Sequence, residues 1–135
     1  MKTLTVKAQE NNLYQVLDFV DGELESAGCS AKSRLQINVA VEELFINIAR
    51  YAYAPQTGDA AVSIDIQGDP PAADITLSDS GMPFDPFSKE DPDISLSAEK
   101  RPVGGLGVLM VKKTMDEVHY EYSDGLNITT ISKLI

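Results

Sequence analysis

The chain has 135 residues, of which 43% are hydrophobic and 24% are charged, and this composition suits one compact domain rather than a disordered segment. The formal net charge of −10 argues against a general nucleic-acid-binding protein, which needs a basic face to neutralise phosphates. A single cysteine, Cys29, excludes an internal disulfide and a multi-cysteine zinc site. The single cysteine leads us to expect a reducing, cytoplasmic environment. The sequence has neither an apolar run of membrane-spanning length nor a signal-peptide pattern, and we expect no membrane contact.

Apolar residues recur along the chain with either the two-residue period of strands or the 3.6-residue period of helices. In chain order, the expected elements are a strand at 2–7, helices at about 11–27 and 31–53, strands at 62–66 and 73–78, a helix at about 105–115, and strands at 118–122 and 128–134. This order favours an α+β fold, a two-layer α/β sandwich whose mostly antiparallel sheet carries its helices on one face. We expect residues 1–135 to form a single domain, since neither a repeat nor an internal boundary is evident.

Two polar residues, Glu43 and Asn47, lie four residues apart in the second predicted helix and therefore share one face of it. Val39 and Tyr51 continue the same stripe, so apolar positions border the pair. An amide oxygen suits a hydrated Mg²⁺, and a carboxylate one turn away can accept a proton from a hydroxyl group or water. Taken alone, such a pair is more often an ordinary part of a helix surface.

Asp79 directly follows the strand predicted at 73–78 and is itself followed by Ser80 and Gly81. A carboxylate at a strand end can accept a hydrogen bond from the exocyclic amine of adenine, and a glycine beside it lets the backbone approach the base. The same residue types also form simple turns that end strands.

A glycine-rich turn, Gly104-Gly105-Leu106-Gly107, opens the third predicted helix, and Lys100 and Arg101 supply positive charge just before it. Free backbone N–H groups and the helix dipole can bind a phosphate at such a position. The spacing is not that of a Walker P-loop, and a flexible hinge is the alternative interpretation. Residues 82–103 show no strong periodicity, and long segments of this kind within small domains are often functional or mobile.

In this order, three segments resemble the nucleotide-binding boxes of the gyrase, heat-shock chaperone, histidine kinase and mismatch-repair ATPase (GHKL) superfamily, which has the Bergerat ATP-binding fold. Residues 41–53 are similar to its N box, residues 79–84 to its G1 box and residues 104–111 to its G2 box. Among short stand-alone members, the chain resembles the bacterial anti-sigma-factor serine/threonine protein kinases of partner-switching pathways.

The resemblance implies an ATP- and Mg²⁺-dependent serine/threonine protein kinase. Glu43 would be its general base, Asn47 its Mg²⁺ ligand and Asp79 its adenine-reading residue, and residues 85–103 would form a lid over ATP. Together, the motifs and the resemblance lead us to expect nucleotide contacts from Asn47, Arg50, Asp79, Gly81, Lys100, Arg101, Gly104, Gly105, Leu106, Gly107 and Thr130. Arg50 stands where many relatives carry a smaller or differently polar residue near the triphosphate.

The resemblance also implies three protein partners: an anti-anti-sigma (STAS-like) protein as the phosphoryl acceptor, a sigma factor or similar regulator that is sequestered, and a second copy of the chain in a homodimer. Many relatives have Gly-Thr where this chain has Gly125-Leu126, and Thr129 or Thr130 could replace that threonine beside adenine. The alternative is a non-catalytic, nucleotide-responsive interaction module of the same fold.

Overall fold

A computed structural model describes residues 1–88 and 106–135, with the backbone alone of Leu106. The strands are β1 (Lys2–Lys7), β2 (Asp59–Gln67), β3 (Ala72–Asp79), β4 (Glu117–Ser123) and β5 (Leu126–Leu134). The helices are a 3₁₀ turn, η1 (Glu10–Asn12), then α1 (Leu13–Ser26), α2 (Ala31–Asn47), a π-helical turn, η2 (Ile48–Ala52), and α3 (Leu106–Thr114). All of the elements expected from the sequence are therefore present, with boundaries shifted by a few residues.

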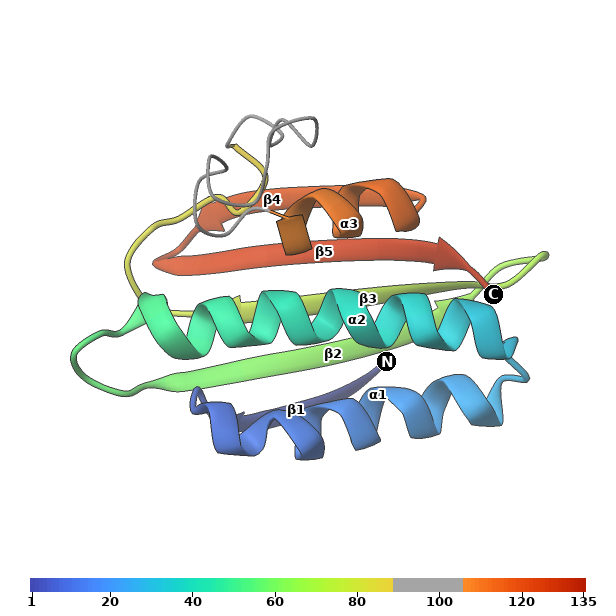
Figure 1. Ribbon diagram of the computed structural model, residues 1–135, viewed down its shortest axis with the longest axis horizontal. Coiled ribbons are helices and arrows are strands. Elements are labelled where there is room, and N and C mark those ends of the chain that lie inside the picture. Colours follow the sequence, from blue (N-terminus) through green and yellow to red (C-terminus); the bar gives the residue numbers. More distant parts are fainter. Residues whose placement is uncertain (89–105) are drawn as a thin grey trace.

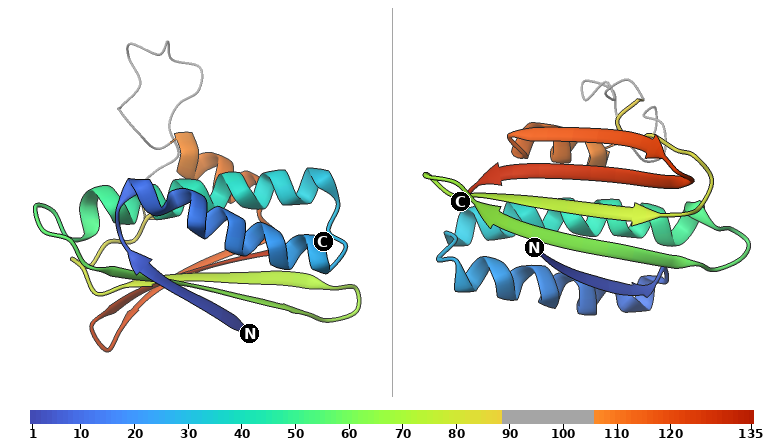
Figure 2. Two further views of the ribbon diagram at one scale, coloured as in Figure 1. Left: turned by 90° about the horizontal axis from the view of Figure 1, so that it is seen from below. Right: turned by 180° about the vertical axis from the view of Figure 1, so that it is seen from behind.

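The strands form one sheet in the order β1-β2-β3-β5-β4, and each of these neighbouring pairs is antiparallel. The helices α1, α2 and α3 cover one face of this sheet (Figures 1 and 2). The expected two-layer α+β sandwich is thus confirmed.

The core lies between the sheet and the two long helices. Its largest fully buried side chains are Phe45, Leu24, Ile37, Ile75, Leu77, Ile131, Val16, Val20, Val41, Val62 and Val111. The other face of the sheet carries polar cross-strand pairs, such as the hydroxyl groups of Thr76 and Thr130, which lie 3.2 Å apart. Because only one face of the sheet is apolar, the helices pack on that face and leave the other one to solvent.

Local signals fix the loop between α1 and α2. The chain leaves α1 at Gly28, whose φ of 75° lies in the left-handed region that favours glycine. Ser30 then caps α2, because its Oγ accepts a hydrogen bond of 3.2 Å from the backbone N–H of Ser33. The two helices consequently lie side by side on the sheet (Figure 1).

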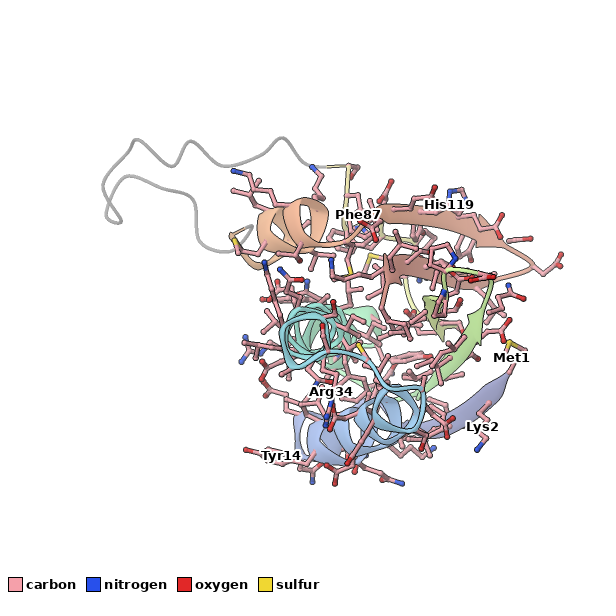
Figure 3. All side chains as sticks on the ribbon, turned by 90° about the vertical axis from the view of Figure 1, so that its right-hand side faces the viewer. Met1, Lys2, Tyr14, Arg34, Phe87 and His119 are labelled. Carbon is pink, nitrogen blue, oxygen red and sulfur yellow. The ribbon has the colours of Figure 1, made fainter. Side chains whose placement is uncertain are left out.

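An ion pair joins α1 to α2 away from the sheet. The guanidinium of Arg34 donates two hydrogen bonds to the carboxylate of Asp21, at 3.0 and 2.7 Å, and Asn38 donates a third at 3.1 Å. Figure 3 shows Arg34 between the two helices. The Arg34 hydrogen bonds hold the pKa of Asp21 below its ordinary value.

Replacing Asp21 with asparagine should therefore lower the free energy of unfolding at neutral pH but not at acid pH. A carboxyl whose pKa is depressed by folding stabilises the protein above its unfolded pKa, and this contribution is lost as the pH falls through the folded pKa. Urea unfolding of wild type and variant, from neutral pH to below the ordinary aspartate pKa, measures the difference. Asp59→Asn is the control, because its pair with Lys7 is exposed and should contribute little at any pH. A difference that persists at acid pH would contradict the expectation.

The end of α2 departs from the expected regular helix. The α-helical pattern stops at Asn47, and residues Ile48–Ala52 form the π-helical turn η2. Turns of this kind occur frequently at functional sites, because one additional residue widens the helix and redirects its side chains. Among the described residues, no helix combines the length and apolarity that a membrane span requires.

Candidate functional site

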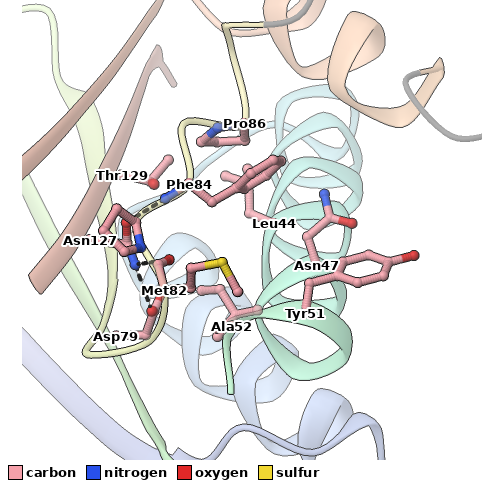
Figure 4. Close-up of a pocket in the computed structure, with 12 residues that line it drawn as sticks. Leu44, Asn47, Tyr51, Ala52, Asp79, Met82, Phe84, Pro86, Asn127 and Thr129 are labelled. Carbon is pink, nitrogen blue, oxygen red and sulfur yellow. Dashed lines mark hydrogen bonds between the residues drawn. The ribbon is translucent and has the colours of Figure 1, made fainter. Parts of the chain in front are cut away.

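A pocket lies between the C-terminal part of α2, the π turn η2, the C-terminal end of β3 and the N-terminal end of β5 (Figure 4). Its lining is formed by Leu44, Asn47, Ile48, Tyr51, Ala52, Asp79, Met82, Pro83, Phe84, Pro86, Asn127 and Thr129. Apolar side chains make up most of this surface. Polar groups stand at one end, on the strands, and Asn47 stands on the helical side (Figure 4). The pocket can therefore take a flat apolar group that carries a few hydrogen-bonding atoms.

The polar end of the pocket is built on two directly opposed strand residues, Asp79 of β3 and Asn127 of β5. Oδ1 of Asp79 accepts hydrogen bonds of 2.9 Å from the backbone N–H of Gly81 and from Nδ2 of Asn127. Oδ2 of Asp79 accepts no hydrogen bond within residues 1–88 and 106–135. Because Asp79 lines the pocket and only 6% of the residue is exposed, this oxygen is available to a ligand that enters the pocket.

Gly81 lies against the π turn. A Cβ atom at Gly81 would overlap the backbone carbonyl of Ala52, and that same carbonyl accepts a 2.9 Å hydrogen bond from the N–H of Met82. The close approach of two backbone segments explains the glycine. The hydrogen bond from Met82 to Ala52 also holds the segment after β3 against the π turn that follows α2. Met82, Pro83 and Ala52 all line the pocket there.

The helical pair Glu43 and Asn47 lies at the α2 side of the site. Both side chains are partly buried, and Nδ2 of Asn47 donates a 3.4 Å hydrogen bond to Oε1 of Glu43. A Cβ atom at Gly107, in the first turn of α3, would overlap the Glu43 carboxylate. The structure thus brings together Glu43, Asn47 and Gly107, which the sequence analysis placed in two separate motifs.

Two other expected nucleotide contacts lie away from this pocket. The guanidinium of Arg50 pairs with Glu10 at 2.7 Å on the surface, and Arg50 is not among the lining residues. Thr130 faces the opposite side of the sheet, where its hydroxyl group meets that of Thr76. Thr129, the other threonine considered, is buried and lines the pocket.

Several expectations fall outside the described residues. These are the nucleotide contacts at Lys100, Arg101, Gly104 and Gly105, the side chain of Leu106, and the greater part of the lid proposed for 85–103.

The comparison with known proteins decides the family. Residues 6–133 match the histidine kinase-like ATPase domain. The chain belongs to this family. The superfamily resemblance expected from the sequence is therefore confirmed, and the Bergerat-type assignment of the fold with it.

Similar members of the histidine kinase-like ATPase family include two proteins named serine-protein kinase RsbW. The one from Listeria monocytogenes is 26% identical over 81% of this chain and 71% of its own length. The one from Bacillus cereus is 30% identical over 68% of this chain, and the match spans 59% of its own length.

Sequence reasoning missed Asn127, which lines the pocket, and Tyr120, which is not among the lining residues and contacts Asn127. Oδ1 of Asn127 accepts hydrogen bonds from the Tyr120 hydroxyl group and from the N–H of Phe84, the latter at 3.0 Å. Burial raises the pKa of Tyr120, so its hydroxyl group remains a donor over a wider pH range. The available signal was the alternation of β5, which puts Asn127 on the same face as the core residue Ile131.

Proposed function

We propose that this member of the histidine kinase-like ATPase family binds ATP with Mg²⁺ and transfers its γ-phosphoryl group to a serine or threonine of a partner protein. The observation that carries the proposal is a buried carboxylate, Asp79, at the end of an apolar pocket, with one oxygen that accepts no hydrogen bond from the part of the chain that the structure describes. A buried carboxylate with a free oxygen selects a ligand with a hydrogen-bond donor, because leaving that oxygen unpaired is costly.

Adenine meets these requirements. Its flat ring would lie among Leu44, Ile48 and Met82, which line the pocket, and its exocyclic amine would donate to Oδ2 of Asp79. Gly81 would lie beside the base, because it stands between Asp79 and Met82 in the sequence, and both of these line the pocket. The lining of the pocket and the position of Asp79 support this proposed adenine end.

The phosphates would lie toward α2 and the start of α3. Asn47 fits a Mg²⁺ ion, since it lines the pocket and has a carbonyl oxygen, the type of atom that this cation prefers. When bound, Mg²⁺ neutralises charge on the phosphate oxygens. Gly107 in the first turn of α3 would face the phosphates, and Lys100, Arg101, Gly104 and Gly105 remain proposed contacts.

Glu43 would act as the general base. As the hydroxyl oxygen of the acceptor bonds to the γ-phosphorus, the bond from that phosphorus to the β,γ-bridging oxygen breaks, and ADP leaves with its electron pair. The hydroxyl proton passes to the Glu43 carboxylate. Its partly buried position beside Asn47 keeps the carboxylate close to the proposed metal ligand.

Likeness to the RsbW serine-protein kinases supports a role in partner switching. The proposed acceptor is an anti-anti-sigma (STAS-like) protein, and the proposed second partner is a sigma factor or similar regulator. A homodimer and a cytoplasmic location belong to the same proposal.

The adenine site is tested by calorimetric titration with ATP and ADP, with and without Mg²⁺. Wild type should bind ATP, and Asp79→Asn should bind it at least about tenfold more weakly, because a charged acceptor is lost. Asp74→Asn is a matched control on the same strand, since Asp74 faces the other side of the sheet and pairs with Ser132. A failure of wild type to bind ATP would contradict the proposed function.

A further inference from the structure

Asn127 is buried, with 5% of the residue exposed, and both polar atoms of its side chain have hydrogen-bond partners. Nδ2 donates to Oδ1 of Asp79 at 2.9 Å and to the backbone oxygen of Met82 at 3.0 Å. Oδ1 accepts from the N–H of Phe84 at 3.0 Å and from the hydroxyl group of Tyr120. Asn127 therefore ties the base-reading carboxylate to the sheet and to the segment that follows β3 (Figure 4).

These contacts divide the two oxygens of Asp79 into different roles. Oδ1 receives two donors, one from Gly81 and one from Asn127, so both of its lone pairs are used. The same two bonds oppose rotation of the carboxylate. A ligand in the pocket consequently meets one acceptor oxygen, Oδ2, rather than the two-oxygen edge of a free carboxylate.

Adenine and guanine present different hydrogen-bonding groups to a carboxylate that has one available oxygen. The amine of adenine needs one acceptor, which Oδ2 supplies. Guanine carries O6 where adenine carries its amine, and an acceptor facing a carboxylate is repulsive. Guanine could instead present its ring N–H and exocyclic amine side by side, but that pair needs both oxygens of the carboxylate. In this pocket Oδ1 of Asp79 already accepts a hydrogen bond from Asn127, so only Oδ2 is available to the base.

We propose that Asn127 is a specificity-determining residue, which makes Asp79 a one-oxygen acceptor and thereby favours adenine over guanine nucleotides. The inference rests on the proposed nucleotide function and extends it to the choice of base. Asn127 acts through Asp79 and is a positioning residue, because its own hydrogen-bonding groups are engaged within the protein.

The test is the ratio of ATP affinity to GTP affinity, measured by calorimetry on wild type, Asn127→Ala and Tyr120→Phe. In Asn127→Ala this ratio should fall at least about tenfold, because Oδ1 of Asp79 regains a free lone pair and the carboxylate can turn. Tyr120→Phe is the matched control. It removes a hydrogen bond to Asn127 but leaves the bond from Asn127 to Asp79, so the ratio should be retained.

Thermal unfolding of each variant shows whether it folds. If Asn127→Ala does not fold, Asn127→Val serves in its place, because a β-branched residue suits a strand and also lacks the donor. An equal loss of ATP and GTP affinity would indicate a merely structural role and overturn the inference alone. Failure of wild type to bind either nucleotide would overturn the proposed function and the inference with it.

Discussion

Glu43→Gln should lower phosphoryl transfer by about 10²- to 10⁴-fold and leave ATP affinity nearly unchanged. Glutamine keeps the size of the side chain and its contact with Asn47, but it cannot accept the hydroxyl proton of the acceptor. Single-turnover transfer of labelled phosphate to a purified STAS-like protein measures the chemical step, and calorimetry measures ATP binding separately.

The neighbouring residue supplies the control for this experiment. Glu42 is exposed and projects from a different side of α2, so Glu42→Gln should transfer phosphate as wild type does. Normal transfer by Glu43→Gln would show that Glu43 is not the base. ATP binding by wild type without transfer to any partner would favour the alternative, a nucleotide-responsive interaction module.

Alanine at Gly81 should destabilise the fold, by about 1–3 kcal/mol or more. Its methyl group would overlap the backbone carbonyl of Ala52, which is fixed by the π turn and by its hydrogen bond to Met82. Relief requires a backbone shift, so the pocket wall should open and ATP binding should weaken. Urea unfolding and calorimetry measure the two effects. A Gly81→Ala variant as stable as wild type would contradict this expectation.

Gly107→Ala is the matched variant and should behave differently. Its methyl group would overlap the Glu43 carboxylate, the far end of a flexible side chain that can rotate away. We expect no loss of stability, because alanine is favoured over glycine in a helix by about 1 kcal/mol. Transfer should nevertheless fall, since the base is displaced. Unchanged transfer in this variant would show that the position of Glu43 against Gly107 is not needed.

The elements themselves could be predicted because their periodicity is local. Helix α1 follows the spacing of Val16, Val20 and Leu24, which are all buried in the core. The start of β2 was missed by three residues, because Asp59 and Ala60 have weak strand propensity and are held by pairing with Lys7 and Val6 of β1. Pairing across strands depends on the fold and not on the local sequence.

The sequence motifs of the site could be predicted, but the contacts between residues of different motifs could not. Glu43 and Asn47 share a helix face by spacing alone. The position of Glu43 against Gly107 depends on how α2 packs on α3, which no local pattern contains. The pairing of Arg50 with Glu10 likewise joins residues far apart in the sequence. Asn127 could not be identified from the sequence, because the role of a polar residue in a strand depends on which face of the sheet packs against the helices.

The register that sets Asp79 opposite Asn127 has a consequence for how such proteins can vary. The segment between these two residues contains α3 and the edge strand β4, and the pairing of β3 with β5 holds its two ends together. The entropy of closing a loop rises only logarithmically with its length, by about 0.6 kcal/mol for each doubling. Insertions or deletions within this segment should therefore cost little stability, provided that they spare α3 and β4. Glu43 and Asn47 lie outside this segment and Asp79 and Asn127 stand at its two ends, so changes in its length should leave these four residues in place.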